Sequence, residues 1–182
     1  SGYYDLKPDL MAIAKGLTSG YLPMGGVLVS DEIAEVLHRE NVEFFHGYTY
    51  SGHPACCAAA IANLNILKRE GLVERVRDHI GPYFQKQWKA LEAHPMVGEA
   101  RMVGLFGALE LVPDESDLKK RFANEGKVGT ITRDHSFANG LVMRAVRDSM
   151  IISPPLSISE EEVDVLIASA KKTLDEAWND VR

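Results

Sequence analysis

The sequence predicts an α/β fold that is followed by a small α+β domain. Two short apolar runs, residues 8–14 and 25–30, read as strands, and each is followed by a turn or by a segment with helical spacing. The first run has no polar alternation after Asp9, which suits a strand in a sheet that is buried on both faces. The second half of the chain differs, because its short strand candidates precede one long amphipathic helix.

The helices of the first half carry recognisable start signals. Ser30 is expected to cap a short helix over residues 31–38, whose first turn has two acidic residues that complement the helix dipole. A loop rich in aromatic residues and glycine follows over residues 41–53. Pro54, at the first helical position, then begins a long helix with a face of small residues.

A second helical stripe begins after Gly71, which interrupts the long helix. A kink is expected at Gly81 and Pro82, because proline cannot continue the backbone hydrogen bonding of a helix. The apolar positions of the stripe recur at helical spacing, and they are Leu72, Val76, Ile80, Phe84, Trp88 and Leu91. We interpret this stripe as core or as a subunit contact.

The remaining elements are short until the last helix. Strands are predicted within residues 107–112, 141–146 and 150–153. A polar stretch over residues 113–129 is expected to be a loop, and residues 130–139 form a helix closed by Gly140. Ser159 and Glu162 have the spacing of a capping box, which opens a final helix. Its apolar face comprises Val163, Leu166, Ile167, Ala170, Leu174 and Trp178.

These elements suggest two domains. Residues 1–80 are expected to belong to a larger domain, with a connecting helix that continues to about residue 94. Residues 95–182 are expected to form the small C-terminal domain. The 182 residues are 46% hydrophobic and 25% charged, which is the composition of a globular chain with a real core.

Composition also argues against several classes of function. The formal net charge of -6 and the lack of a basic cluster argue against nucleic-acid binding. No apolar run is long enough to cross a bilayer, so no membrane partner is expected. The six histidines show no metal-binding spacing. Cys56 and Cys57 are adjacent and rarely bridge in that arrangement, which indicates a reduced, cytoplasmic protein.

Lys15 is the residue that points to chemistry. It ends the first apolar run and opens a turn of small residues, where backbone can approach a ligand closely. Burial lowers the pKa of a lysine amine, and only the neutral amine attacks a carbonyl to form a Schiff base. By position alone, a solvated lysine after a strand is the commoner explanation.

Three segments taken together change that balance, namely residues 8–25 around Lys15, residues 46–54 and residues 140–144. They resemble the C-terminal part of a class III, fold type I aminotransferase, an enzyme that uses pyridoxal 5'-phosphate (PLP). The resemblance extends over essentially the whole chain and is strongest to the ω-amine:pyruvate branch. It implies that the first part of the chain belongs to the large domain of that fold, which has a mostly parallel sheet.

The resemblance implies that Lys15 forms the Schiff base with PLP. A substrate amine can displace this lysine, and the freed amine is then a suitable base for moving a proton from the substrate Cα. PLP itself supplies the electron sink. Arginine could not replace Lys15, because a guanidinium stays protonated.

Thr49 and Tyr48 are implied to bind the PLP phosphate of the opposite subunit in a homodimer. A hydroxyl just before a helix start, supported by the amides of the helix N-terminus, is a reasonable phosphate ligand. From the residues alone, a role for Thr49 only in shaping the turn is the commoner explanation, and the match of the loop is what favours the phosphate role.

Arg144 is implied to bind the substrate carboxylate in a bidentate manner. The alternative is an exposed ion pair, and the nearby Arg147 is a competing candidate that matches the motif less well. Tyr21 and Val146 are expected to line the substrate pocket. The substrates implied are an amine or amino-acid donor and a keto-acid acceptor, with pyruvate preferred.

The family places its other cofactor contacts upstream of the residues present here. We therefore expect the chain to be one segment of a larger protein, inactive without its N-terminal part. Two alternatives remain open: a catalytically inactive fragment or dimerisation scaffold, and an aminomutase or ornithine-type transaminase. Finding the acidic residue that holds the pyridine nitrogen in a contiguous upstream segment would favour the active enzyme.

Overall fold

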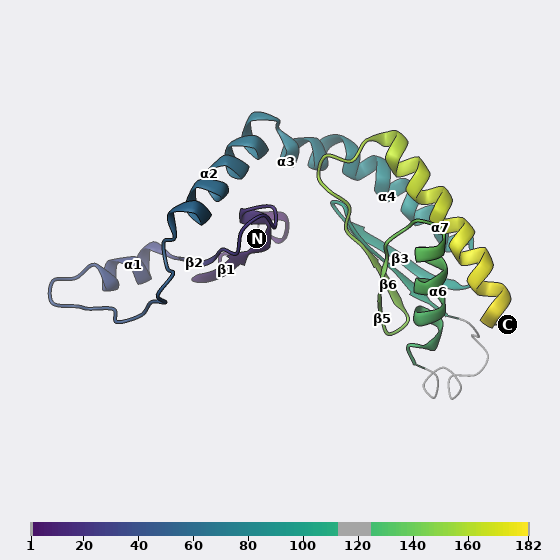
Figure 1. The fold of residues 1–182 in the computed structure, drawn as a ribbon, viewed down its shortest axis with the longest axis horizontal. Helices are drawn as coiled ribbons and strands as arrows, with labels where there is room; N and C mark the ends of the chain where they lie inside the picture. The colour runs from purple at the N-terminus through teal and green to yellow at the C-terminus, as the bar shows by residue number, and fades with distance from the viewer. Residues whose placement is uncertain (1, 113–124, 182) are drawn as a thin grey trace. The chain divides into compact units, whose positions relative to one another are not determined.

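The computed structural model describes residues 2–112 and 125–181. These residues form two compact units, which divide between Glu70 and Gly71. This division lies earlier in the chain than the boundary expected from the sequence, and the assignment of the two domains stays a prediction. Figure 1 shows the elements of each unit.

The first unit is built on two strands and a long helix. Its elements are η1 (Gly2–Tyr4), β1 (Leu10–Ala14), η2 (Lys15–Leu17), β2 (Gly25–Val29), α1 (Asp31–Leu37) and α2 (Pro54–Arg69). Strands β1 and β2 pair antiparallel, with Leu10 opposite Val29 and Ala14 opposite Gly25. The connection between them is too short for the crossover that a parallel pair requires. These two strands therefore pair as a small antiparallel sheet of their own, and the mostly parallel sheet of the large domain stays a prediction.

Burial in the first unit also differs from expectation. Strand β1 was expected to be covered on both faces, yet Leu10 is 60% exposed and Val27, on β2, is 59% exposed. Ser30 precedes α1 as predicted, but its hydroxyl makes no capping bond. That hydroxyl is buried without a partner among the described residues, so the predicted side-chain cap is wrong. Pro54 does begin α2, as predicted.

The second unit packs helices against an antiparallel sheet. Its elements are α3 (Leu72–Arg75), the π-helical segment η3 (Val76–Ile80), α4 (Gly81–Lys89), η4 (Ala90–Ala93), β3 (Val97–Val103), β4 (Phe106–Leu111), α6 (Lys127–Ala138), β5 (Arg144–Val146), β6 (Ser149–Ile152) and α7 (Glu160–Val181). The strand order is β3-β4-β6-β5, and every neighbouring pair is antiparallel. The helices α4, α6 and α7 cover one face of this sheet (Figure 1).

The core of the second unit confirms the two predicted helical stripes, except that Leu72 is not part of it. Phe84 and Trp88 are fully buried in α4, and their rings pack edge to face at 5.7 Å. The Trp88 indole nitrogen donates a hydrogen bond to the carbonyl of Ala108 in β4. The predicted apolar face of α7 is likewise buried or packed against the core. The capping box is present, because Ser159 and Glu162 each donate a backbone N–H to the other's side chain.

Several boundaries in the second unit differ from the predictions. Strand β3 was not predicted, α6 begins three residues earlier than expected, and β5 is confined to Arg144–Val146. Part of the predicted loop over residues 113–129 lies outside the described residues. The kink expected at Gly81 is a π-helical turn that ends there. A Cβ at Gly81 would lie 2.2 Å from the carbonyl oxygen of Val76, so the wide turn requires glycine.

The described residues contain neither a candidate membrane span nor a candidate metal cluster. No helix among them is long and apolar enough to span a bilayer. In the same residues, no three His, Cys, Asp or Glu side chains are grouped so that they could hold a metal ion.

Candidate active site

Lys15 lies at the junction of β1 and a tight 3₁₀ turn. Its φ of 49° is in the left-handed region, which costs a non-glycine residue about 1–2 kcal/mol. Strain of this kind persists only where surrounding structure imposes it, and it is concentrated at functional sites. The Lys15 amine has no hydrogen bond or ion pair with any described residue, so it is available to react. The side chain is exposed in this chain, and the burial expected around it is not supplied by the described residues.

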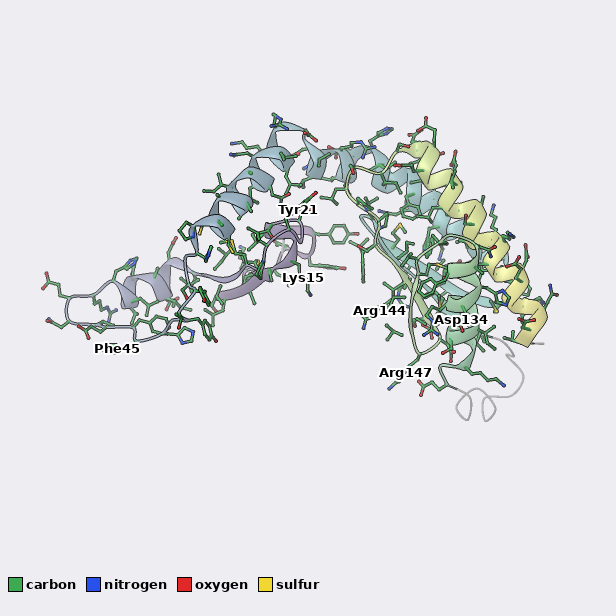
Figure 2. The ribbon with its side chains drawn as sticks, viewed as in Figure 1. Lys15, Tyr21, Phe45, Asp134, Arg144 and Arg147 are labelled. Atoms are coloured by element: carbon green, nitrogen blue, oxygen red, sulfur yellow. The ribbon has the colours of Figure 1, made fainter. Side chains whose placement is uncertain are left out.

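Tyr21 belongs to the same turn region as Lys15. Its backbone N–H donates to the carbonyl of Thr18, and its side chain is 86% exposed. Figure 2 labels both side chains on the same small part of the first unit. The turn therefore brings Lys15 and Tyr21 into one region, which the pocket prediction requires. The pocket itself stays a prediction.

The Thr49 loop is closed by Ser51. The backbone N–H of Tyr48 donates to the Ser51 hydroxyl at 3.0 Å, and the Ser51 N–H donates back to the Tyr48 carbonyl at 2.9 Å. Thr49 is in the turn between them and makes no hydrogen bond with a described residue. His53 then caps α2, because its Nδ1 accepts from the N–H of Ala55. The loop thus presents a free hydroxyl just before a helix N-terminus, which is suitable chemistry for a phosphate.

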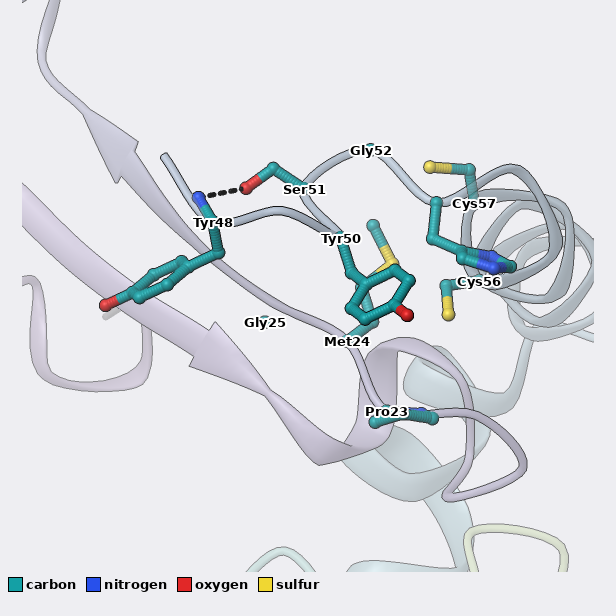
Figure 3. Close-up of a pocket in the computed structure, with 10 residues that line it drawn as sticks. Pro23, Met24, Gly25, Tyr48, Tyr50, Ser51, Gly52, Cys56 and Cys57 are labelled. Carbon is teal, nitrogen blue, oxygen red and sulfur yellow. Dashed lines mark hydrogen bonds between the residues drawn. The ribbon is translucent and has the colours of Figure 1, made fainter. Parts of the chain in front are cut away.

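This loop borders a cavity of about 240 Å³ in the first unit (Figure 3). The wall combines the loop with the start of β2 and the first turn of α2, and its residues are Pro23, Met24, Gly25, Tyr48, Tyr50, Ser51, Gly52, His53, Cys56 and Cys57. Lys15 is not among them. Of the residues expected to bind the phosphate, Tyr48 lines this cavity and Thr49 does not, so the cavity holds neither Thr49 nor Lys15 in its wall.

Arg144 and Val146 lie on the open face of the second unit's sheet. Side chains alternate between faces along a strand, and the intervening Ala145 packs against the core. Arg144 pairs with Ile151 and Val146 with Ser149, on the edge strand of the sheet. Both side chains are exposed, so they share a face that the helices of this unit do not cover.

The two candidate arginines, which are both labelled in Figure 2, differ in their partners. Arg147 lies in the β5–β6 turn with a φ of 54°, and its guanidinium pairs with Glu125 at 2.9 Å. The Arg144 guanidinium makes no hydrogen bond or ion pair with any described residue. A free guanidinium on an open face can bind a carboxylate, whereas one that is already paired must first lose its partner. The geometry therefore favours Arg144 over Arg147 as the carboxylate ligand.

Asp148 fixes the position of the hairpin that carries Arg144. Its carboxylate accepts the N–H groups of Gly126 and Gly129 at 2.9 Å each, at the N-terminus of α6. Negative charge is favoured there by the helix dipole. Gly129 allows the close approach, because a Cβ at that position would lie 1.9 Å from the carbonyl oxygen of Arg147.

Sequence reasoning missed three supporting residues, Ser51, Asp148 and Asn63. Ser51 had a local signal, since serine hydroxyls commonly bond to backbone two or three residues away. Asp148 follows Arg147 in a two-residue hairpin turn, but its partners in α6 are about twenty residues distant. Asn63 in α2 had no signal at all, because its side-chain amide binds the carbonyls of Gly16 and Leu17, which are 47 and 46 residues away.

A model of the family described as aminotransferase class III matches residues 1–174. The chain is 55% identical over 176 residues to a putrescine–pyruvate aminotransferase from Pseudomonas aeruginosa, across 97% of this chain and 38% of that protein. Among solved structures, a thermostable (S)-enantioselective ω-transaminase from Thermomicrobium roseum superimposes with a TM-score of 0.86. The two are 41% identical, and the match covers 97% of this chain and 39% of that one.

A further structure is an aminotransferase from Vibrio fluvialis in its PMP-bound form. It has a TM-score of 0.87 and 31% identity, over 100% of this chain and 40% of that one. The present chain therefore spans about two fifths of the length of the relatives it matches. The α/β fold that was predicted is confirmed by these similarities.

Proposed function

Because this chain belongs to the class III aminotransferase family, we propose that its full-length protein moves amino groups between an amine and a keto acid. The donor is a primary amine or an ω-amino acid, and the acceptor is pyruvate. The family is PLP-dependent, and PLP when bound supplies the electron sink for this chemistry. The similarity to a putrescine–pyruvate aminotransferase supports this choice of substrates.

The observation that carries the proposal is the unpartnered Lys15 amine in a strained turn at the end of β1. The neutral Lys15 amine would hold PLP through its aldehyde carbon, with loss of the aldehyde oxygen as water, and the free amine would accept and return the proton of the substrate Cα. The strained backbone fixes the direction from which the side chain leaves the strand. No other lysine of the described residues combines a strand end with a left-handed φ.

Two further residues complete the proposed assignment from this chain. The free hydroxyl of Thr49 donates to the cofactor phosphate, and Tyr48 lies beside it in the same loop. Arg144 binds the carboxylate of the keto or amino acid through its free guanidinium. Since Tyr48 lines a cavity from which Lys15 is absent, we propose that this loop, with Thr49, serves the site of a second subunit in a homodimer.

The experiment that tests the proposal is borohydride reduction of the full-length protein with PLP, followed by peptide mapping. Reduction fixes the cofactor on the amine that carries it, so the pyridoxyl label is expected on Lys15. The K15R variant serves as the control, because arginine retains the charge but does not form the same bond. A label on any other lysine would refute the assignment. A protein that takes no label would support the alternative of a non-catalytic scaffold.

A further inference from the structure

We infer that Asn63 of α2 is a positioning residue, which fixes the orientation of Lys15 by binding the backbone of its turn. The side-chain amide of Asn63 donates to the carbonyl of Gly16 at 2.8 Å and to that of Leu17 at 3.1 Å. Both partners are carbonyl oxygens, so only the NH₂ group of the amide can face them. The inference rests on the proposed function, in which Lys15 is the lysine that binds the cofactor.

The Lys15 turn is weakly held by its own hydrogen bonds. The N–H groups of Thr18 and Gly20 reach the Lys15 carbonyl only at 3.4 and 3.3 Å, and the Ser19 N–H reaches the Gly16 carbonyl at 3.4 Å. These distances exceed the usual range for N–H···O bonds, which ends near 3.2 Å. The two bonds from Asn63 lie within that range. They are therefore shorter than the bonds that the turn's own N–H groups make to the Lys15 and Gly16 carbonyls, and the Tyr21 N–H binds the Thr18 carbonyl further along at 3.1 Å.

The turn also contains strain that an external contact must balance. Lys15 and Ser19 both have positive φ values, 49° and 51°, although neither is a glycine. The Thr18 hydroxyl, which is almost fully buried, donates to the carbonyl of Leu22 and so stabilises the later part of the segment. Among the described residues, Asn63 provides the side-chain hydrogen bonds to Gly16 and Leu17, directly after Lys15. Without them, the backbone at Lys15 could relax toward an ordinary φ and redirect the amine.

Position along α2 makes this contact specific. Asn63 is half-buried against the turn, while Asn65, two residues later on the same helix, is exposed and its side chain makes no hydrogen bond with a described residue. The two asparagines have the same chemistry and the same helix propensity cost. Asn65 is therefore a matched control for Asn63.

The test uses the full-length protein freed of its cofactor. N63D keeps the shape of the side chain but directs carboxylate oxygen at two carbonyls, and N63L keeps a similar volume with no donor. We expect both variants to capture PLP on Lys15 at least about ten-fold more slowly than wild type, measured by the change in visible absorbance, because loss of these bonds misplaces the amine. The visible circular dichroism of the bound cofactor should also change, and the N65D control should stay within about two-fold of wild type.

Folding is checked by far-ultraviolet circular dichroism and the unfolding midpoint of each cofactor-free variant. If N63D fails to fold, the uncharged N63L carries the test. Wild-type capture rates and spectra in both variants, or an equal loss in N65D, would overturn the inference. Peptide mapping of the reduced wild type separates this outcome from failure of the proposed function. A label on Lys15 together with unaffected variants refutes only the role of Asn63.

Discussion

Because of the close contact at Gly129, we expect Gly129→Ala to lower stability, whereas helix propensity alone predicts that it raises stability. Replacing a glycine by alanine inside a helix normally stabilises it by about 1 kcal/mol. In α6, however, the new Cβ of a G129A variant would lie 1.9 Å from the Arg147 carbonyl oxygen, and contacts under 3.0 Å are not tolerated. The β5–β6 hairpin must therefore move by about 1 Å (3.0 − 1.9).

That movement has a cost that can be worked out from the hydrogen bonds of Asp148. Both bonds from its carboxylate to α6 are 2.9 Å long, and a shift of about 1 Å takes them out of range. Each hydrogen bond to a charged group contributes about 1.5–3 kcal/mol. Subtracting the gain in propensity, and allowing for partial relaxation, we expect a net loss of about 2–4 kcal/mol.

The assay is native-state hydrogen exchange of the full-length protein, read over residues 126–152, because exchange reports the local opening free energy. The control is G140A at the other end of α6. Gly140 has a φ of 72°, and a Cβ added there would meet no atom within 4 Å, so its replacement costs only backbone strain, about 1–2 kcal/mol. If the amides of residues 126–152 exchanged as slowly in G129A as in wild type, or more slowly, the argument from the close contact would be refuted.

Three further predictions concern other parts of the chain. R144A should slow turnover of the keto acid far more than the half-reaction of a simple amine in stopped-flow assays; equal losses would argue against a carboxylate role. S159A should lower stability by about 1 kcal/mol in thermal unfolding, because it removes one half of the capping box, whereas the exposed S157A should have no effect. The hydrogen bond from Tyr83 to Asp164 raises the pKa of Tyr83 from 10.0 to about 12. The raised pKa means that the folded state favours the neutral phenol. The difference in unfolding free energy between wild type and Y83F should therefore be constant below pH 10 and vanish as the pH rises through about 12. A difference that persisted above that pH would contradict the assignment.

The features that the sequence predicted well are those whose causes are local. The Ser159 capping box, the start of α2 at Pro54 and the buried stripe of α7 all depend on residues within a few positions of one another. The identity of Lys15 came from a resemblance between segments, and its strained φ could not have been read from composition or periodicity.

The features that were missed depend on distant partners. Strand β3 contains Gly98, Glu99 and Arg101, so it has little of the apolar pattern of a strand, and its pairing with β4 defines it. Ser30 has the residue type and position of an N-cap, but its hydroxyl is buried without a hydrogen bond to the helix. Similarly, nothing in the sequence distinguishes Asn63 from Asn65, because the carbonyls that distinguish them belong to another segment.

Helix α2 connects two functions that the proposal assigns to different active sites. Its N-terminus follows the Thr49 loop, and its tenth residue is Asn63, about 14 Å further along the axis. In the proposed homodimer, one end of this rigid rod would contact the partner's cofactor and its middle would hold the chain's own lysine. Binding of PLP at one site would then change the PLP affinity of the other site. Titration of the empty dimer with PLP should therefore give a cooperative rather than a simple hyperbolic curve.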